Sequence, residues 1–592
     1  MTYVKITPPP GVYTEVPQYT AEGRWVSTEK VRFRYEFPEK IGGWAKAATT
    51  STTGVPRNIH TWRELDGIKN IALADEYFLY INQGGTQYEL TPLRTSGVSL
   101  GSNPLTMTSS SPTVTVAHTS HGITVVGCKA IIAGASAAHG ITVTGTYIVQ
   151  SIPDANSFTI THTSNASSSG TGGGGSVTAS YTLNVVESNA IFGYGFGSST
   201  YNSSTWGTAR STSNVTLDLA YWSLGNWGED LVATPRNGVP YAWDSSAGTS
   251  SRAAAISGAP SQVGLTLVST PDRHLIALGA HDGSTYDPML IRWSDQEDYT
   301  TWTAAAANTA GSQRLGRGNK IIAAEQSRNT ILVWTDEELH AMQYIGPPYT
   351  FGFQPIATGC GAIGVNAVVT HENGAFWMGQ NNFWMLDGQP GIISCPILNH
   401  VFDDLNSMQA DKIYAGINAE FDEVWWHYPT ADSTENDAYI VYNYKDKIWY
   451  FGTMGRTTWL DRGTYGYPLA TNSAGELFYH EYTTNSDGIG FSAYCETGAF
   501  EPGEGEHMSF LDKIIPDSTL GDNGSLSVTV YTRRYPNSSD ITKGTYTTNN
   551  STEKVSLRAR GRQYRFRFEA NDADNAWKLG TWRANIQADG KR

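Results

Sequence analysis

The chain has 592 residues, a formal net charge of −15 and only 16% charged residues, with 18 Trp, 32 Tyr and 61 Gly. Its length exceeds what one hydrophobic core usually organises, and its acidic charge argues against a protein that binds nucleic acid by neutralising phosphates. The charge is compatible with a duct through which DNA slides past a like-charged wall, and equally with ordinary solubility. Because aromatic and β-branched residues favour strands and Gly favours turns, we expect an all-β protein of two to four domains, or one large repeat architecture, with little helix.

Residues 1–100 begin as an extended arm and continue into short strands of a platform or propeller. Pro8-Pro9-Pro10-Gly11 cannot start a helix, and β-type runs follow at 25–33 and 71–81. The N-terminus lacks the basic start and apolar core of a signal peptide, and no apolar run approaches the roughly 18 residues of a membrane span. We therefore expect a soluble protein that is made in a cytoplasm.

Residues 101–180 differ in kind from the rest of the chain. Ser, Thr, Ala and Gly dominate, and the stretch closes with SSSGTGGGG at 167–175. The pentapeptide HGITV occurs at 121–125 and again at 139–143. Alternating residues separated by regular turn signals predict an inserted module, either a small β-sandwich or a stack of hairpins.

Residues 181–490 contain repeated hairpins in which two aromatic, β-branched strands flank a polar turn. We predict such hairpins at 231–243, 331–344, 375–386, 423–444 and 442–451. Meandering hairpins of this kind are typical of propeller blades, although no strict repeat of about 40–50 residues identifies a known propeller class. The region is therefore predicted to be β-propeller-like.

Residues 491–592 form the last predicted module, a β-sandwich or platform. Alternation over 525–531 and 563–568 indicates strands with one buried and one solvated face. A basic run accompanies them, and at period two most of its arginines could share a face: Arg558, Arg560, Arg562, Arg565 and Arg567. A solvated or subunit-contacting strand is the favoured interpretation, and a DNA-facing stripe is the alternative.

Motifs for nucleophilic or phosphate chemistry are not found. The sequence has no GxSxG elbow, and the glycine-rich runs 193–197 and 359–364 lack the Lys-Ser/Thr of a phosphate loop, which favours tight turns. The four cysteines, Cys128, Cys360, Cys395 and Cys495, stand far apart and are interpreted as buried thiols. No cofactor is therefore expected.

Metal sites are also not favoured. His118 and His121 would point to opposite faces of a strand, and the acidic loops 282–287 and 432–437 lack the regular pattern of a calcium loop, so polar turns are the better interpretation. Paired carboxylates on neighbouring strands of a glycosidase would leave no local motif, so that chemistry stays open. Aromatics that alternate within strands indicate core more often than a sugar-stacking platform.

Framework residues near the N-terminus carry a family resemblance. Val31-Arg32-Phe33-Arg34, followed by Pro38-Glu39-Lys40-Ile41-Gly42-Gly43-Trp44, resembles the opening VRFR and PEKIGGW segments of tail nozzle, or tail tubular protein B-like, subunits of short-tailed bacteriophages. Further segments are similar to that family at 291–295 with Trp302, 377–387, 439–451, 514–517 and 560–563. The resemblance spans most of the chain outside 101–180.

The resemblance implies a structural, propeller-bearing virion subunit without catalytic, cofactor-binding or metal residues, assembled in the host cytoplasm. Six copies would form a homohexameric ring at the distal end of the tail. The ring would continue and gate the channel for genomic DNA, without sequence-specific binding, and dock tail fibre or spike proteins and the tail adaptor protein. The insertion is similar to Ig-like insertions on virion surfaces. Two alternatives stay open: a receptor- or glycan-binding fibre or spike component, and a polysaccharide-degrading enzyme.

Overall fold

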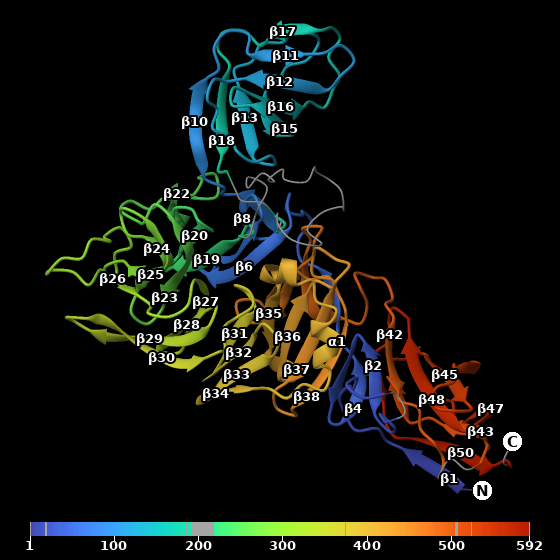
Figure 1. Cartoon of the computed structure of the whole chain (residues 1–592). Coiled ribbons are helices and arrows are strands. Elements are labelled where there is room, and N and C mark those ends of the chain that lie inside the picture. Colours follow the sequence, from blue (N-terminus) through green and yellow to red (C-terminus); the bar gives the residue numbers. More distant parts are fainter. Residues whose placement is uncertain are drawn as a thin grey trace, which may run out of the picture. The chain divides into compact units, whose positions relative to one another are not determined.

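A computed structural model describes residues 2–17, 20–184, 188–190, 218–372, 374–503, 507–522 and 524–590 (Figure 1). Nearly all of its regular structure is strand, and within those residues the one α-helix is the short α1 (Leu398–Phe402). The prediction of an all-β chain with little helix is confirmed. The chain divides into two compact units, unit 1 (1–51, 322–343 and 353–592) and unit 2 (52–321 and 344–352).

Besides the two sheets of the inserted module, the described residues of unit 2 form three antiparallel sheets, each a meander of four consecutive strands. Their strands are β6 (Pro56–Arg63), β7 (Lys69–Asp75), β8 (Leu79–Gln83) and β9 (Thr86–Glu89); β19 (Trp222–Trp227), β20 (Asp230–Pro235), β21 (Tyr241–Trp243) and β22 (Ala254–Ala255); and β23 (Val263–Ser269), β24 (His274–His281), β25 (Tyr286–Trp293) and β26 (Gly311–Arg314). The predicted hairpin at 231–243 is confirmed, because Leu231 pairs with Trp243. Such four-stranded meanders are the blades of β-propellers.

Three of the four crossings of the chain between the units lie within a fourth meander, and two more meanders follow in unit 1. Their strands are β27 (Ile321–Ser327), β28 (Thr330–Thr335), β29 (Glu338–Gly346) and β30 (Thr350–Thr358); β31 (Val368–His371), β32 (Gly374–Met378), β33 (Phe383–Asp387) and β34 (Gln389–Ile392); and β35 (Tyr414–Asn418), β36 (Glu423–Tyr428), β37 (Ala438–Asn443) and β38 (Ile448–Thr453). The remaining predicted hairpins are confirmed by their registers.

The last blade-type sheet joins segments far apart in the sequence. β39 (Thr458–Leu460), β40 (Leu469–Thr471) and β41 (Leu477–Thr483) are completed by β5 (Gly43–Lys46), which pairs with β41. The aromatic strands form the core, as the sequence predicts: every residue of β36 is buried, including the adjacent Trp425 and Trp426. Since successive side chains of a strand point to opposite faces, both faces of this sheet are covered.

The inserted module is a sandwich of two sheets with its own core, coloured light blue to cyan in Figure 1. One sheet has the order β10 (Leu93–Ser99), β18 (Thr178–Thr182), β13 (Lys129–Ala133) and β14 (Gly145–Ile148); the other has β15 (Ser151–Asp154), β16 (Ser157–Thr161), β12 (Thr113–Ala117), β11 (Leu105–Met107) and β17 (Gly170–Gly172). The two HGITV segments place Ile123 and Ile141 in that core. The predicted inserted sandwich is confirmed, and its strands extend from Leu93 to Thr182, which pair with each other.

The C-terminal residues of unit 1 fold together with the N-terminal arm, so blue and red strands lie side by side in Figure 1. The three sheets have the orders β1 (Thr2–Ile6), β50 (Trp582–Ala588), β43 (Ser509–Ile515), β47 (Val555–Gly561); β2 (Trp25–Glu29), β42 (Ala493–Thr497), β48 (Gln563–Ala570), β45 (Leu526–Arg533), β46 (Ile541–Thr548); and β3 (Val31–Arg34), β4 (Phe37–Lys40), β49 (Trp577–Leu579), β44 (Ser518–Leu520). β45 alternates buried and half-buried residues throughout, as predicted for this strand.

Candidate functional site

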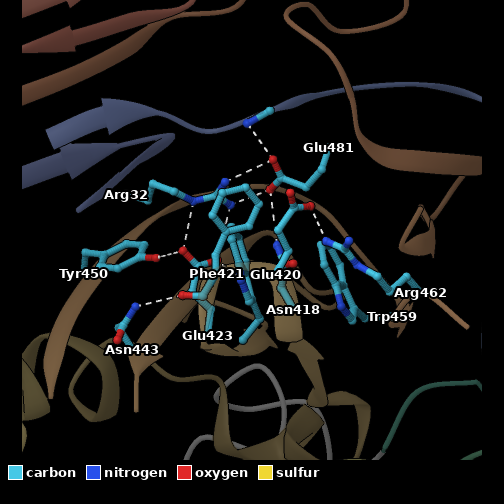
Figure 2. Close-up of polar contacts among 12 residues, drawn as sticks. Arg32, Asn418, Glu420, Phe421, Glu423, Asn443, Tyr450, Trp459, Arg462 and Glu481 are labelled. Carbon is cyan, nitrogen blue, oxygen red and sulfur yellow. Dashed lines mark hydrogen bonds and ion pairs between the residues drawn. The ribbon is translucent and has the colours of Figure 1, made fainter. Parts of the chain in front are cut away.

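The VRFR and PEKIGGW segments are organised around one buried arginine. Arg32, on β3, lies between Glu423 at the start of β36 and Glu481 on β41, and Figure 2 shows both carboxylates reaching its guanidinium. Arg32 Nε donates to Glu423 Oε1 at 2.9 Å, and Nη1 donates to Glu481 Oε2 at 3.1 Å. The three side chains are 2%, 1% and 8% exposed. One cation is therefore shared by two carboxylates in the interior of unit 1.

The carboxylate oxygens that bind Arg32 also accept further hydrogen bonds. Glu423 accepts from the Tyr450 hydroxyl and, at 2.9 Å, from Trp425 Nε1. Glu481 accepts from the Gly42 amide at 2.9 Å and from Asn418 Nδ2 at 3.3 Å. Such satisfaction is what a buried charge cluster needs in order to persist in a low-dielectric interior.

The electrostatics keep the cluster ionic. Burial opposes the charge of Arg32, but the attraction of Glu423 and Glu481 outweighs it and holds the arginine pKa well above its usual value. Burial raises the pKa of Glu423, which Arg32 partly offsets. Burial and the Glu423 carboxylate raise the pKa of Tyr450, so its hydroxyl stays protonated and donates. The ring of Phe421 covers the guanidinium at 3.5 Å from carbon to centroid.

A β-bulge brings Glu481 to the arginine. Glu481 has a φ of +55°, and the pairing of β41 with β5 shifts there, so that Trp44 pairs with His480 and Gly43 with Thr483. A bulge inserts an extra residue and re-aims a side chain. The two glycines of the motif fit this geometry, because a Cβ on Gly42 would overlap Glu481 and one on Gly43 would overlap the backbone of Asn485.

The contacts within the Arg32 cluster indicate a structural role. Two carboxylates on neighbouring strands could suggest the acid and base of a glycosidase. In this cluster, however, both are bound to the same guanidinium and are nearly or fully buried. Acid–base catalysis requires hydrogen-bond reach to a substrate atom. The cluster instead ties β3 to the sheets that contain β36 and β41.

A second buried cluster lies nearby in unit 1. Arg456 Nε donates to His480 Nε2 at 2.8 Å, which requires a neutral His480, and the Trp44 ring lies 4.9 Å from the guanidinium carbon. Burial lowers the pKa of Arg456 to about 9. Burial and the nearby Arg456 lower the pKa of His427 to about 3 and that of His480 well below its usual value. Both histidines are therefore neutral in the folded protein at neutral pH.

Acid should destabilise unit 1 through these histidines. The pKa of His427 is lower in the folded chain, near 3, than the unperturbed value of about 6.5, so its contribution to stability is complete above pH 6.5 and is lost as pH falls toward 3. We expect the free energy of unfolding to fall by up to about 1.4 kcal/mol per pH unit for each such histidine. His427→Gln should flatten this slope in denaturant titrations between pH 7 and 4. A slope in His427→Gln equal to that of the unaltered chain would contradict this role.

The five predicted arginines do not form one stripe. Arg558 and Arg560 lie on β47 and Arg565 and Arg567 on β48, and these strands belong to different sheets, so the expectation that most of them share a face is wrong. The chain turns between them at Gly561 and Arg562, and the Arg562 guanidinium lies over the Tyr535 ring at 5.3 Å.

Carboxylates also compensate the charges of three of these arginines. Arg567 is ion-paired with Glu496 at 3.0 Å and Glu569 at 2.9 Å, and Arg565 with Glu496 and with Asp540 at 2.6 Å. Arg560 pairs with Asp589 at 2.6 Å. A surface neutralised in this way offers little net charge to a phosphate backbone.

The histidines and acidic loops that the sequence offered as metal sites form turns and loop contacts. His118 Nδ1 contacts the Tyr181 hydroxyl at 2.7 Å, whereas His121 Nε2 contacts the Asp154 carbonyl at 3.0 Å, so the two do not act together. Asp282 closes its own turn by accepting from the Thr285 amide at 2.7 Å. Asp437 likewise accepts from the Thr430 amide at 2.8 Å.

The remaining sequence predictions concern glycine runs and thiols. The run 359–364 is a turn between β30 and β31, with Gly359 at a φ of +72°, and the run 193–197 lies outside the described residues. Three of the four cysteines are buried as predicted, and Cys395 is half-buried. In the part of the chain that the structure describes, no group of three or more His, Cys, Asp or Glu residues is arranged to hold a metal ion. None of the helices described there is both long and apolar enough to cross a membrane.

Sequence reasoning missed the partners of Arg32. Glu423 follows a turn and Glu481 lies within a mixed polar and aromatic strand, and neither position carries a local motif. The alternation of Val31 and Phe33 with Arg32 and Arg34 would instead place Arg32 on a solvated face, so no local signal marked it as a buried, paired group.

Comparisons with known proteins give distant matches only. No family model matches the chain, and no curated protein matches it. A solved fungal alcohol oxidase of the AA5 family with copper is 10% identical at a TM-score of 0.32, covering 82% of this chain and 93% of its own. A BBS1 N-terminal fragment bound to ARL6 is 12% identical at a TM-score of 0.25, covering 75% of this chain and 99% of its own. An exo-β-1,3-galactanase from Phanerochaete chrysosporium is 9% identical at a TM-score of 0.20, covering 63% of this chain and 97% of its own. Similarities at these TM-scores carry no functional inference.

Proposed function

We propose that this chain is a structural subunit of a bacteriophage tail nozzle, forming a six-membered ring that continues and gates the DNA-ejection channel. The supporting observation is the role of the VRFR and PEKIGGW segments. Arg32, Gly42 and Gly43 build the ion-paired junction between the N-terminal strands and the blade-type sheets. These residues therefore serve the framework on which the family resemblance rests.

Other segments of the resemblance also serve the framework. In unit 2, Arg292 Nη2 donates to the Trp302 carbonyl at 3.2 Å, and the Leu275 amide donates to Ser294 Oγ at 3.0 Å. In unit 1, Trp377 and Trp384 stack across a hairpin at 6.1 Å. Residues that fix turns and pair strands suit a structural subunit. In this role the chain is a component of the tail and not a catalyst.

The charge of the chain is compatible with a duct. A net charge of −15 gives DNA little to adhere to, so a passing duplex would not be retained. In this assembly the genome slides through the lumen, the proximal side binds the adaptor protein, and fibres or spikes attach outside. The subunits meet through a heterologous interface that closes after six copies.

The stoichiometry of the purified protein tests this proposal. Light scattering on the full chain should give a particle of six copies, each of 64.4 kDa. A monomer that persists at high concentration would contradict the ring. A trimer would favour a fibre or spike component instead.

The inserted module should be dispensable for that assembly. Its core is self-contained, and its first and last strands pair at Leu93 and Thr182, so a short linker could replace the segment between them. We expect the shortened chain to keep the stoichiometry of the full chain. Loss of the assembly in a shortened chain that still folds, as judged by circular dichroism, would place the module in the ring interface.

Receptor or glycan binding is a second candidate function. It is supported by an aromatic groove in unit 1 with a predominantly acidic rim, because such a surface can stack on a sugar ring and accept hydrogen bonds from its hydroxyl groups.

A further inference from the structure

A groove of about 800 Å³ lies between the sheet of β31–β34 and strand β37 with the turn that follows it. This volume falls within the range of about 300–1,000 Å³ that is typical of small-molecule sites. All of its lining residues belong to unit 1. It is separate from the Arg32 cluster, since none of the residues that bind Arg32 lines it.

The floor and walls of the groove are apolar and aromatic. Phe376 on β32 and Tyr442 on β37 are buried at its base, and Met385 on β33 lies beside them. The Tyr444 ring stacks on Phe376 at 5.7 Å and lies 4.7 Å from the His371 ring. Ile392 adds a wall residue that is 56% exposed. Half-buried aromatic and aliphatic surface of this kind binds the apolar face of a ring-shaped ligand.

The rim of the groove carries more hydrogen-bond acceptors than donors. Glu372 and Asp387 are exposed on the side of the β31–β34 sheet, and Ser394 adds a hydroxyl group. Lys447, in the turn after β37, is the cation of the opposite side. Glu15 also lines the groove, but its carboxylate already holds the Asn399 amide at 2.8 Å.

The Tyr444 hydroxyl is held by a hydrogen bond to Asp422. Burial, reinforced by the carboxylate of Asp422, raises the pKa of Tyr444 to about 12, so the hydroxyl keeps its proton at neutral pH. Tyr444 therefore offers its ring to a ligand, while its O–H group is engaged by Asp422.

We propose that this groove binds a neutral saccharide, with a sugar ring against Tyr444 and sugar hydroxyls donating to Asp387 and Glu372. A sugar ring combines an apolar C–H face with a rim of O–H donors, which matches the aromatic wall and the acceptor-rich edge. A sialylated, sulfated or phosphorylated ligand would bring its negative charge against these carboxylates. A purely apolar ligand would leave the carboxylates without the donors that a sugar supplies.

Binding can be measured on the full chain by saturation-transfer NMR and isothermal titration. Lactose, maltotriose and chitotriose are the neutral probes, and sialyllactose is the acidic probe. We expect at least one neutral probe to bind and sialyllactose to bind more weakly than lactose. Tyr444→Ala should weaken the binding of the neutral probe about five- to tenfold, because it removes the ring contact.

Two further variants make the test specific. Tyr467→Ala is the matched control: this exposed tyrosine packs against Tyr482 at 4.8 Å and does not line the groove, so its loss should leave saccharide affinity unchanged. Asp387→Asn, at an exposed position, should narrow the difference in affinity between lactose and sialyllactose, because it removes one charge that repels the acidic sugar.

Several results would overturn the proposal. These are the failure of every neutral probe to bind, an equal loss of affinity in Tyr444→Ala and Tyr467→Ala, or sialyllactose binding as tightly as lactose. Light scattering on the same variants separates this site from the ring, because the groove substitutions should leave the stoichiometry of the full chain unaltered. Saccharide binding by a chain that forms no ring would support the groove and contradict the nozzle.

Discussion

Arg32→Met should destabilise unit 1 by about 3–5 kcal/mol, because it leaves the buried carboxylates of Glu423 and Glu481 without their cation. Burial already raises the pKa of Glu423, and without Arg32 it should rise further, so the variant should lose most stability at neutral and alkaline pH. The measurement is the free energy of unfolding in denaturant, followed by tryptophan fluorescence. Arg32→Met combined with Glu423→Gln and Glu481→Gln should recover part of the loss, since the uncompensated charges are then absent.

A matched control lies in the same view of Figure 2. Arg462 pairs with Glu420, but these side chains are 37% and 45% exposed. Exposed ion pairs contribute about 0–1 kcal/mol, so Arg462→Met should have a small effect. Equal losses in Arg462→Met and Arg32→Met would contradict the structural role assigned to the buried cluster.

Gly43→Ala should cost about 3 kcal/mol, the upper part of the range for overpacking. A Cβ at this position would overlap the carbonyl oxygen and the amide nitrogen of Asn485, and backbone atoms cannot rotate away as a flexible side chain can. Asn485 also accepts from the Trp44 amide at 2.9 Å, so a shift there would disturb the pairing of β5 with β41. We expect a lower midpoint of thermal unfolding together with weaker near-UV circular dichroism from Trp44.

Gly463→Ala provides the comparison for Gly43→Ala. No atom lies within 4 Å of a Cβ built on Gly463, and its φ is not in the left-handed region. Substitution there should change stability by a few tenths of a kcal/mol. A tolerated Gly43→Ala, with unfolding like that of Gly463→Ala, would show that the close approach of β5 to Asn485 is not required.

Local patterns predicted the hairpins well. The strands that flank residues 379–382, for example, lie next to each other in the sequence, so alternation and turn residues suffice to pair Ala375 with Leu386. The inserted sandwich was equally accessible, because composition changes abruptly at its borders and its core is formed by its own residues.

Long-range pairing could not be predicted from the sequence. β5 pairs with a strand more than 430 residues away, and Arg32 binds carboxylates that lie 391 and 449 residues later. No local signal specifies such partners. The prediction that the arginines share a face was wrong for a related reason. Alternation predicts a shared face only while the chain stays in one sheet, and the chain changes sheets at Gly561.

The candidate groove could not be predicted from the sequence either. Tyr442 and Tyr444 are separated by two positions, which indicates one face of a strand, but the partners Phe376 and Asp387 come from another sheet. The sequence could therefore indicate aromatic strands without showing which rings are packed in the core and which line an open surface.

Image averages of the purified full chain by electron microscopy test the nozzle most directly. We expect six-fold rings with a central hole wide enough for duplex DNA. Single particles without symmetry, or trimeric rods without a hole, would contradict it.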